Sequence, residues 1–282
     1  MWSSLRRAAC PRSRTRTVRL SGPAQSDLAR CRHAAGRTRQ HGRIAARLLR
    51  WLGAALLAWL LLSASAVLML RWFTPLTSAM MLEARMQSWA AQQRHARIDF
   101  EWVSLEQISA HAAIAVIASE DQLFPFHAGF DFNSIREAVR ASERGKRLRG
   151  ASTISQQVAK NLFLWSGHSF VRKGLEAYFT VLIEWLWPKE RILEMYLNIA
   201  QFGDGIYGVQ AAAQRFWHIP ALKLTSAQAA LLAAVLPNPE HLHAERPSRY
   251  VLQRRDWILG QMRALGGDAY LRALERERPG TR

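Results

Sequence analysis

Two adjacent carboxylates, Glu120 and Asp121, follow the apolar run Ala112–Ala118. If that run is a helix, both side chains lie at its C-terminal end, beside apolar neighbours and the negative end of the helix dipole. These surroundings disfavour the charged form and raise the pKa of a carboxyl group, as a general base or acid working near neutral pH requires. An acidic pair can equally be a solvated helix end, and these residues alone leave both interpretations open.

A second group of polar side chains shares one helical face, because Thr153, Gln157 and Lys160 are spaced i, i+4 and i+7. Thr153 stands where the helix would begin, so its free backbone N–H groups lie near the start of this face. A helix N-terminus beside a lysine is a natural anion site. The alternative is a polar stripe on the surface of the domain.

The third group is Arg172, Lys173 and Glu176, in which Arg172 and Glu176 are four residues apart. One interpretation is a surface ion pair of little energetic weight. The other pairs both cations with a diphosphate, which Arg binds as a fork and Lys as a point charge. Glu176 would then be a second acid in the same cleft.

Helices must position these groups, because no segment beyond the apolar run near residue 70 shows the alternation of a strand. Capping boxes that begin at Ser104, Thr153 and Thr225 predict three helix starts, and Pro188 predicts a break between two helices. We expect helices near 76–94, 108–119, 154–164, 170–187, 189–199, 209–217 and 227–235, and a last one from 249 to about 266. The pattern predicts one all-α domain of about 200 residues.

A membrane anchor precedes this domain. Trp51–Leu70 contains twenty residues and no charge, and as a helix of about 30 Å it matches the hydrocarbon core of a bilayer. The rival interpretation is a cleaved signal peptide, since Ser63–Ala66 offers small residues at cleavage-like spacing. The apolar run continues beyond that site and is longer than a usual signal sequence, which favours an uncleaved anchor.

The positive charge of the chain is concentrated before the anchor. Residues 1–50 hold thirteen Arg and one acid, and they account for +12 of the formal net charge of +18. This asymmetry predicts a cytoplasmic N-terminus and a domain on the other side of the membrane. Nucleic-acid binding would need that charge on the folded domain. The charge therefore indicates orientation.

Residues 1–50 are rich in Arg, Ser, Thr and Gly, which predicts a disordered tail that either binds anionic lipids or has no function. Both cysteines, Cys10 and Cys31, lie in this tail, so the exported part must be stable without disulfides. The basic loop 144–150 is either a solvated turn or a segment that lies near lipid head groups. The expected organisation is a tail over 1–50, an anchor over 51–70, a catalytic domain over 72–266 and a C-terminal tail over 267–282.

Taken together and in order, the motifs resemble those of the peptidoglycan glycosyltransferases. The resemblance rests on five segments, EDQLFPFHAGFD, GASTISQQVAKNLFL, RKGLE, ILEMYLN and GDGIYGVQAAA, and covers roughly residues 72–240. It implies a membrane-anchored enzyme that polymerises lipid II into glycan strands, with a lysozyme-like, mostly helical fold of a head lobe and a jaw lobe that dips into the membrane.

The resemblance also implies a role for each matching residue. Glu120 is the general base for the acceptor 4-hydroxyl, and Glu176 is the second carboxylate. The substrate-binding residues that the resemblance implies are Asp121, Phe124, His127, Ser152, Thr153, Gln157, Lys160, Asn161, Arg172 and Lys173. Glu194, Tyr196 and Asn198 match a further motif, and we interpret them as structural.

The implied enzyme is monofunctional, because the chain has no Ser-x-x-Lys or Lys-Thr-Gly motif of a penicillin-type transpeptidase. Its partners would be lipid II, the nascent strand, membrane lipids, and transpeptidases or other divisome or elongation proteins. We predict no metal site and no cofactor; a divalent ion bridging the lipid diphosphate stays open. A lysozyme-like glycan hydrolase and an inactive wall scaffold are the alternatives.

Overall fold

The computed structural model describes residues 24–91, 97–143, 152–167, 169–267 and 269–271. The basic loop 144–150 lies outside these residues. The chain divides into two compact units, Met1–Leu61 and Leu62–Arg282. In the first unit the described residues form one helix, because α1 (Ala24–Met69) begins far before the apolar run.

The prediction of a disordered tail over 1–50 is therefore wrong from Ala24 onward. Ala, Leu and Arg are strong helix formers, and each residue added to an existing helix gains a hydrogen bond without a new nucleation step. Within α1, Arg47–Met69 is long and apolar enough to cross a membrane, with a mean hydropathy of 2.2. No other helix in the described part of the chain passes that test. This segment suits membrane anchoring.

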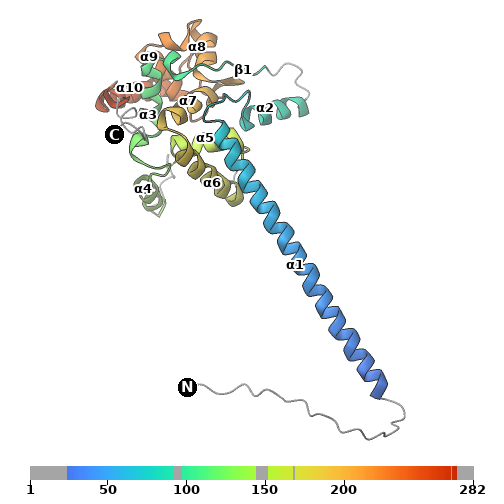
Figure 1. Cartoon of the computed structure of the whole chain (residues 1–282). Helices are drawn as coiled ribbons and strands as arrows, with labels where there is room; N and C mark the ends of the chain where they lie inside the picture. The colour runs from blue at the N-terminus through green and yellow to red at the C-terminus, as the bar shows by residue number, and fades with distance from the viewer. Residues whose placement is uncertain (1–23, 92–96, 144–151, 168, 268, 272–282) are drawn as a thin grey trace, which may run out of the picture. The chain divides into compact units, whose positions relative to one another are not determined.

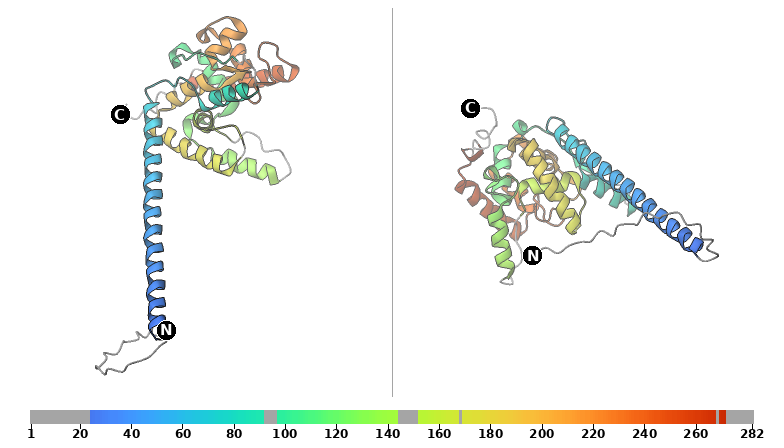
Figure 2. Two further views of the ribbon diagram at one scale, coloured as in Figure 1. Left: turned by 90° about the vertical axis from the view of Figure 1, so that its right-hand side faces the viewer. Right: turned by 60° about the horizontal axis from the view of Figure 1, so that its bottom comes forward.

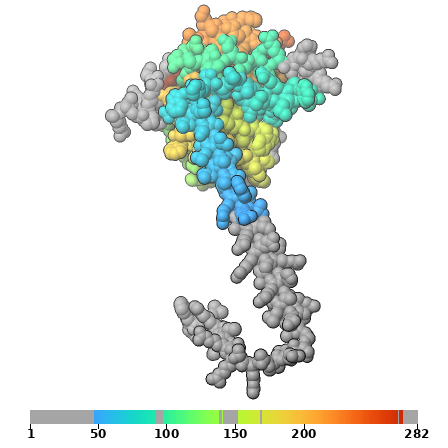
Figure 3. Space-filling model, turned by 45° about the vertical axis from the view of Figure 1, so that its right-hand side comes forward, coloured from blue at the N-terminus to red at the C-terminus, as the bar shows by residue number. Residues whose placement is uncertain are grey.

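The last turns of α1 belong to the second unit and are held there by hydrogen bonds. Trp187 Nε1 donates to the carbonyl oxygen of Val67 at 2.7 Å. Arg191 donates to the carbonyl oxygens of Leu70 and Phe73 at 2.9 and 2.8 Å. Figure 3 shows yellow residues from this middle part of the chain beside the blue-to-cyan end of α1. The end of the apolar helix is therefore part of the folded domain.

The second unit is mostly helical, as expected. Its α-helices are α2 (Ala79–Ala90), α3 (Ala110–Glu120), α4 (Phe132–Glu143), α5 (Ile154–Phe163), α6 (Phe170–Leu186), α7 (Lys189–Ile199), α8 (Val209–Trp217), α9 (Ser226–Val235) and α10 (Arg249–Ala264). Short 3-10 turns occupy η1 (Leu105–Gln107), η2 (Phe124–Phe126) and η3 (Ala221–Lys223). In this unit α8 lies at one end, and α4 and α6 lie at the opposite end (Figures 1 and 2).

Two helix packings position the site. Helix α3 packs against α9 and α10, and every residue from Ala112 to Ala118 is buried. Helix α5 packs against α6 and α7. Small alanine side chains let α3 and α9 approach closely. The end of α3 and the start of α5 are therefore held together by the core.

The helix starts largely agree with the caps in the sequence. Thr153 Oγ1 accepts from Gln156 N at 3.2 Å, Ser169 Oγ from Arg172 N, and Ser248 Oγ from Val251 N. The prediction for Ser104 is wrong, because its box closes the 3-10 turn η1 and α3 begins only at Ala110. Ser109 caps α3 instead, since its own hydroxyl is anchored on the carbonyl oxygen of Leu224.

A small sheet was not expected from the sequence. Strand β3 (Ile206–Tyr207) pairs in parallel with β1 (Asp99–Phe100) and antiparallel with β2 (Gln201–Gly203). Strands of two or three residues are too short to show alternation. The described part of the domain is therefore mostly helical with a minor sheet.

Candidate active site

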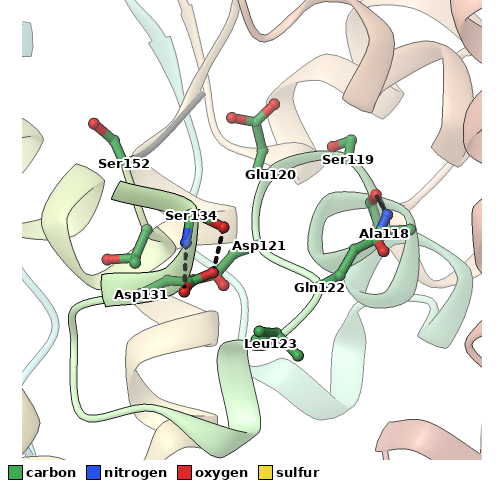
Figure 4. Close-up of a pocket in the computed structure, with 10 residues that line it drawn as sticks. Ala118, Ser119, Glu120, Asp121, Gln122, Leu123, Asp131, Ser134 and Ser152 are labelled. Atoms are coloured by element: carbon green, nitrogen blue, oxygen red, sulfur yellow. Dashed lines mark hydrogen bonds between the residues drawn. The ribbon is translucent and has the colours of Figure 1, made fainter. Parts of the chain in front are cut away.

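Glu120 ends α3 and borders a hollow of about 340 Å³ that Ser119, Asp131 and Ser152 also line (Figure 4). Its Oε2 accepts from Gln157 Nε2 at 3.0 Å, and its Oε1 lies 3.6 Å from Arg254 Nη2. Burial raises the pKa of Glu120, and the hydrogen bond from Gln157 and the charge of Arg254 oppose that rise. The raised pKa is the direction expected from the sequence.

Gln157 is held from its other side by Tyr196. The Tyr196 hydroxyl donates to Gln157 Oε1 at 3.0 Å, which leaves the amide N–H₂ facing the carboxylate of Glu120. Tyr196 is buried, and this burial raises the pKa of its hydroxyl well above the ordinary value, so it stays a donor. Tyr196, which we interpreted as structural, therefore also orients Gln157 and, through it, the carboxylate of Glu120.

Asp121 points away from Glu120 and into the fold (Figure 4). Its carboxylate accepts from His127 Nε2 at 2.9 and 3.0 Å and from the backbone N–H of Ile154 at 3.0 Å. His127 Nδ1 in turn accepts from Gly129 N at 3.1 Å. These bonds tie the end of α3 to η2 and to the first turn of α5.

Two further predicted substrate residues are also buried. Thr153 Oγ1 donates to the carbonyl oxygen of Gly129 at 2.7 Å, and its side chain caps α5. Phe124 is fully buried and packs edge to face against His127. Among the residues that line the hollow beside Glu120, Asp121 and Thr153 are buried and hydrogen-bonded within the fold, whereas Ser152 is exposed.

A second hollow of about 190 Å³ lies on the other side of Gln157 and is lined by Lys160, Asn161, Tyr196 and Tyr207. Burial lowers the pKa of Lys160, and the nearby cations Arg172 and Lys173 lower it further, while Glu176 and Glu83 oppose them. Gln157 lines this second hollow and contacts Glu120, which borders the first. The structure thus brings the first two sequence motifs together.

The third motif is an ion cluster on α6 in which Arg172 and Glu176 are buried and Lys173 is exposed. Arg172 Nη1 donates to Glu176 Oε2 at 2.8 Å, and Lys173 Nζ pairs with Glu176 Oε1. Arg172 and Glu176 are buried, so the interpretation as a surface ion pair is wrong. Arg172 Nε is buried without a hydrogen-bond partner among the described residues. An unpaired buried donor is uncommon in a native fold and points to a ligand.

Sequence reasoning missed some groups at the site. Arg254 reaches Glu120 from α10, a helix with several Arg residues and no motif. Asp131 borders the first hollow and accepts from the N–H groups of Asn133 and Ser134 at 3.0 Å, and the Ser134 bonds lower its pKa. Its position before α4 is a cap signal that could have been noticed. No group of three or more His, Cys, Asp or Glu residues within the described ranges could hold a metal ion.

A mostly helical domain in which a shielded acid borders a polar hollow, with cations on adjacent helices, has the groups that acid–base chemistry on an anionic substrate requires. A sequence model of the transglycosylase family matches residues 86–263. A protein of Xanthomonas axonopodis pv. citri (strain 306), called biosynthetic peptidoglycan transglycosylase, is 52% identical over 231 residues, which is 82% of this chain and 94% of the relative. A protein of the same name from Xylella fastidiosa (strain M23) is 52% identical over 211 residues, 75% of this chain and 87% of the relative. The chain belongs to the transglycosylase family, which confirms the resemblance of its motifs.

Proposed function

We propose that this enzyme is a monofunctional peptidoglycan glycosyltransferase that polymerises lipid II into β-1,4-linked glycan strands. The observation that carries the proposal is the largely shielded carboxylate of Glu120, which borders a polar hollow and accepts a hydrogen bond from Gln157, itself held by Tyr196. Lys160 follows Gln157 by one helical turn on α5. The name of the relatives, biosynthetic peptidoglycan transglycosylase, supports the same reaction.

In the proposed reaction Glu120 takes the proton from the 4-hydroxyl of the acceptor sugar. The resulting oxygen attacks C1 of the donor glycan, and the bond from C1 to the diphosphate oxygen breaks. The electron pair of that bond leaves with the polyprenyl diphosphate, and attack from the opposite side inverts the anomeric centre. Burial of Glu120 supports this role, because the raised pKa makes its carboxylate a better proton acceptor.

The cations of α5 and α6 stabilise the charge that develops on the departing diphosphate. Lys160, Arg172 and Lys173 are near enough to affect one another electrostatically. Arg172 keeps a buried N–H group free of partners among the described residues, and Lys173 is half exposed. A diphosphate would share these donors with Glu176, which orients both cations. Asn161 and Ser152 supply further polar contacts at the two hollows.

The proposed site is divided into contacting and positioning residues. Glu120, Ser152, Gln157, Lys160, Asn161, Arg172 and Lys173 contact substrate, whereas Asp121, Phe124, His127 and Thr153 hold those residues in place. Both groups belong to a catalytic domain over 72–266, between the anchor over 51–70 and the tail over 267–282.

The anchor orients this domain outside the cytoplasmic membrane. Residues 1–50 carry the excess Arg, so they stay in the cytoplasm, and the catalytic domain faces the extracytoplasmic side. The domain then meets the lipid-linked substrate at the outer leaflet. Cross-linking of the product requires separate transpeptidases, which would work beside this enzyme with other divisome or elongation proteins.

Polymerisation tests the function directly. Full-length protein in detergent micelles receives labelled lipid II, and the products are separated by length for the wild type, for Glu120→Gln and for Glu101→Gln. Glu101 is an exposed acid outside both hollows and serves as the control. Long glycan from the wild type and the control, and none from Glu120→Gln, is the expected result. No polymer from folded wild type overturns the proposal, and shortening of preformed glycan would favour a hydrolase.

Cysteine labelling tests the orientation. Cys10 and Cys31, the two cysteines of the chain, are predicted to be protected from a membrane-impermeant thiol reagent in intact spheroplasts and to react after lysis. A Glu101→Cys variant is predicted to react before lysis. The reverse pattern would contradict the proposed orientation.

A further inference from the structure

One side chain from outside the sequence motifs reaches the proposed base. Arg254 lies in α10, and its Nη2 is 3.6 Å from Glu120 Oε1, while the other carboxylate oxygen, Oε2, accepts from Gln157 at 3.0 Å. Both side chains are largely shielded from solvent, with exposures of 24% for Arg254 and 17% for Glu120. The two oxygens of Glu120 thus have different partners, one a cation and one a neutral amide.

The neighbouring arginines of α10 behave differently. Arg255 donates from Nε and Nη2 to Asp256 Oδ1 at 2.8 and 2.6 Å, next to it in the chain. Arg263 donates to the carbonyl oxygen of Leu259 within its own helix. Arg254 instead reaches Glu120 at the end of α3, which is far from it in the sequence.

One donor of the Arg254 guanidinium is not used in hydrogen bonds within the described fold. The Nε atom is buried and has no hydrogen-bond partner within the described residues. A purely structural arginine would have its buried donors satisfied, because an unpaired buried donor costs stability. A buried donor without a partner calls for an explanation such as a role at the site, and here the guanidinium lies beside the carboxylate of Glu120.

The groups that act on Glu120 come from several elements. Gln157 on α5 and Arg254 on α10 favour its charged form, and Asp121, its neighbour in the chain, opposes it. Tyr196 on α7 interacts with the charge of Glu120 and with Gln157. Asp131 borders the same hollow. Of these groups, Arg254 is the one that carries a positive charge.

We infer that Arg254 is a positioning residue for the general base, whose guanidinium keeps the carboxylate of Glu120 charged and turned toward the acceptor hydroxyl. The inference rests on the proposed function, since it concerns the base of that reaction. It explains how a buried carboxylate with a raised pKa still accepts a proton near neutral pH. Arg254 acts through Glu120 and is not assigned a contact with the substrate.

The test is the pH profile of kcat/KM for polymerisation by the full-length protein. An opposite charge within 4–6 Å lowers a carboxyl pKa by about one to three pH units, and partial exposure puts this site at the lower end. In Arg254→Met the acid limb should move up by about one pH unit. At pH values below the limb kcat/KM should then be about tenfold lower than in the wild type, and at pH values above the limb it should change little. Arg254→Lys keeps the charge and should retain most of the wild-type profile.

Arg255→Met is the matched control, because it removes an arginine of the same helix that pairs with Asp256. An unmoved acid limb in folded Arg254→Met, or an equal shift in Arg255→Met, overturns the inference. If Arg254→Met does not fold, Arg254→Gln is measured in the same way. An acid limb at the wild-type pH in Arg254→Gln likewise overturns the inference. Polymerisation by Glu120→Gln would instead refute the proposed base, whereas an inactive Glu120→Gln with an unmoved Arg254→Met limb refutes the role of Arg254 alone.

Discussion

Asn198 offers a test of whether the ILEMYLN motif, on α7, is scaffold or active site. The side chain is fully buried, and its Oδ1 accepts from Val103 N at 2.9 Å. Its Nδ2 donates to the carbonyl oxygens of Val103 and Glu194 at 2.9 and 2.8 Å. Asn198 thus fastens the segment before η1 to α7, and it lines neither hollow of the site.

Replacing Asn198 with Ala removes all three bonds. The N–H and C=O groups of Val103 are then left buried without partners, and each orphaned group costs about 1–3 kcal/mol. The free energy of unfolding should therefore fall by about 4 kcal/mol. For a domain of this size each kcal/mol corresponds to about 2–4 °C in Tm, so we expect a decrease of about 8–16 °C.

The measurement is thermal unfolding of the full-length protein in detergent at a fixed scan rate, with polymerisation assayed well below the transition. Gln214→Ala, at an exposed position on α8, is the control and should leave Tm unchanged. Asn198→Ala should keep kcat within about twofold, because the hollows are intact. A decrease in Tm of less than about 3 °C would refute the free-energy cost assigned to the unpaired N–H and C=O groups of Val103. An unchanged Tm with a large loss of kcat would assign Asn198 to the active site.

Three further predictions concern the base, its partner and a turn. The acid limb of kcat/KM should lie above the ordinary carboxyl value of 4.5, because burial raises the pKa of Glu120 and activity is lost as pH falls through that pKa; a limb at or below 4.5 contradicts this. Gln157→Ala removes the donor that orients Glu120, and steady-state kinetics should show kcat lower by about a hundredfold. An unchanged kcat would exclude a role for the Tyr196–Gln157–Glu120 hydrogen bonds in orienting the base. Gly208→Ala should lower the free energy of unfolding by more than about 2 kcal/mol, because φ is +86° and a Cβ would lie 2.6 Å from the carbonyl oxygen of Asn198. Gly174→Ala in α6, where nothing lies within 4 Å of a new Cβ, should instead raise the free energy of unfolding by about 0.5–1 kcal/mol. Both free energies are measured by urea titration, and equal effects of the two substitutions would contradict the steric argument.

Local chemistry determined much of this protein from the sequence alone. The helix over Lys189–Ile199 follows from Pro188, and the start of α5 follows from the capping box at Thr153, because caps and proline act within one turn of the chain. The apolar stretch before the domain is equally local, since twenty uncharged residues suffice to indicate an anchor. The raised pKa of Glu120 could be foreseen from its place after an apolar run.

Only the tertiary structure decided which side chains meet. Asp121 looks like a second site acid in the sequence, but packing turned it toward His127 and the first N–H of α5. Arg254 carries no sequence signal, yet it reaches Glu120 because α10 packs against α3, the helix that Glu120 ends. Hydrogen-bond and charge partners far apart in the chain are chosen by how helices pack. The proposed base was therefore suggested by its local sequence, and its environment is a property of the folded domain.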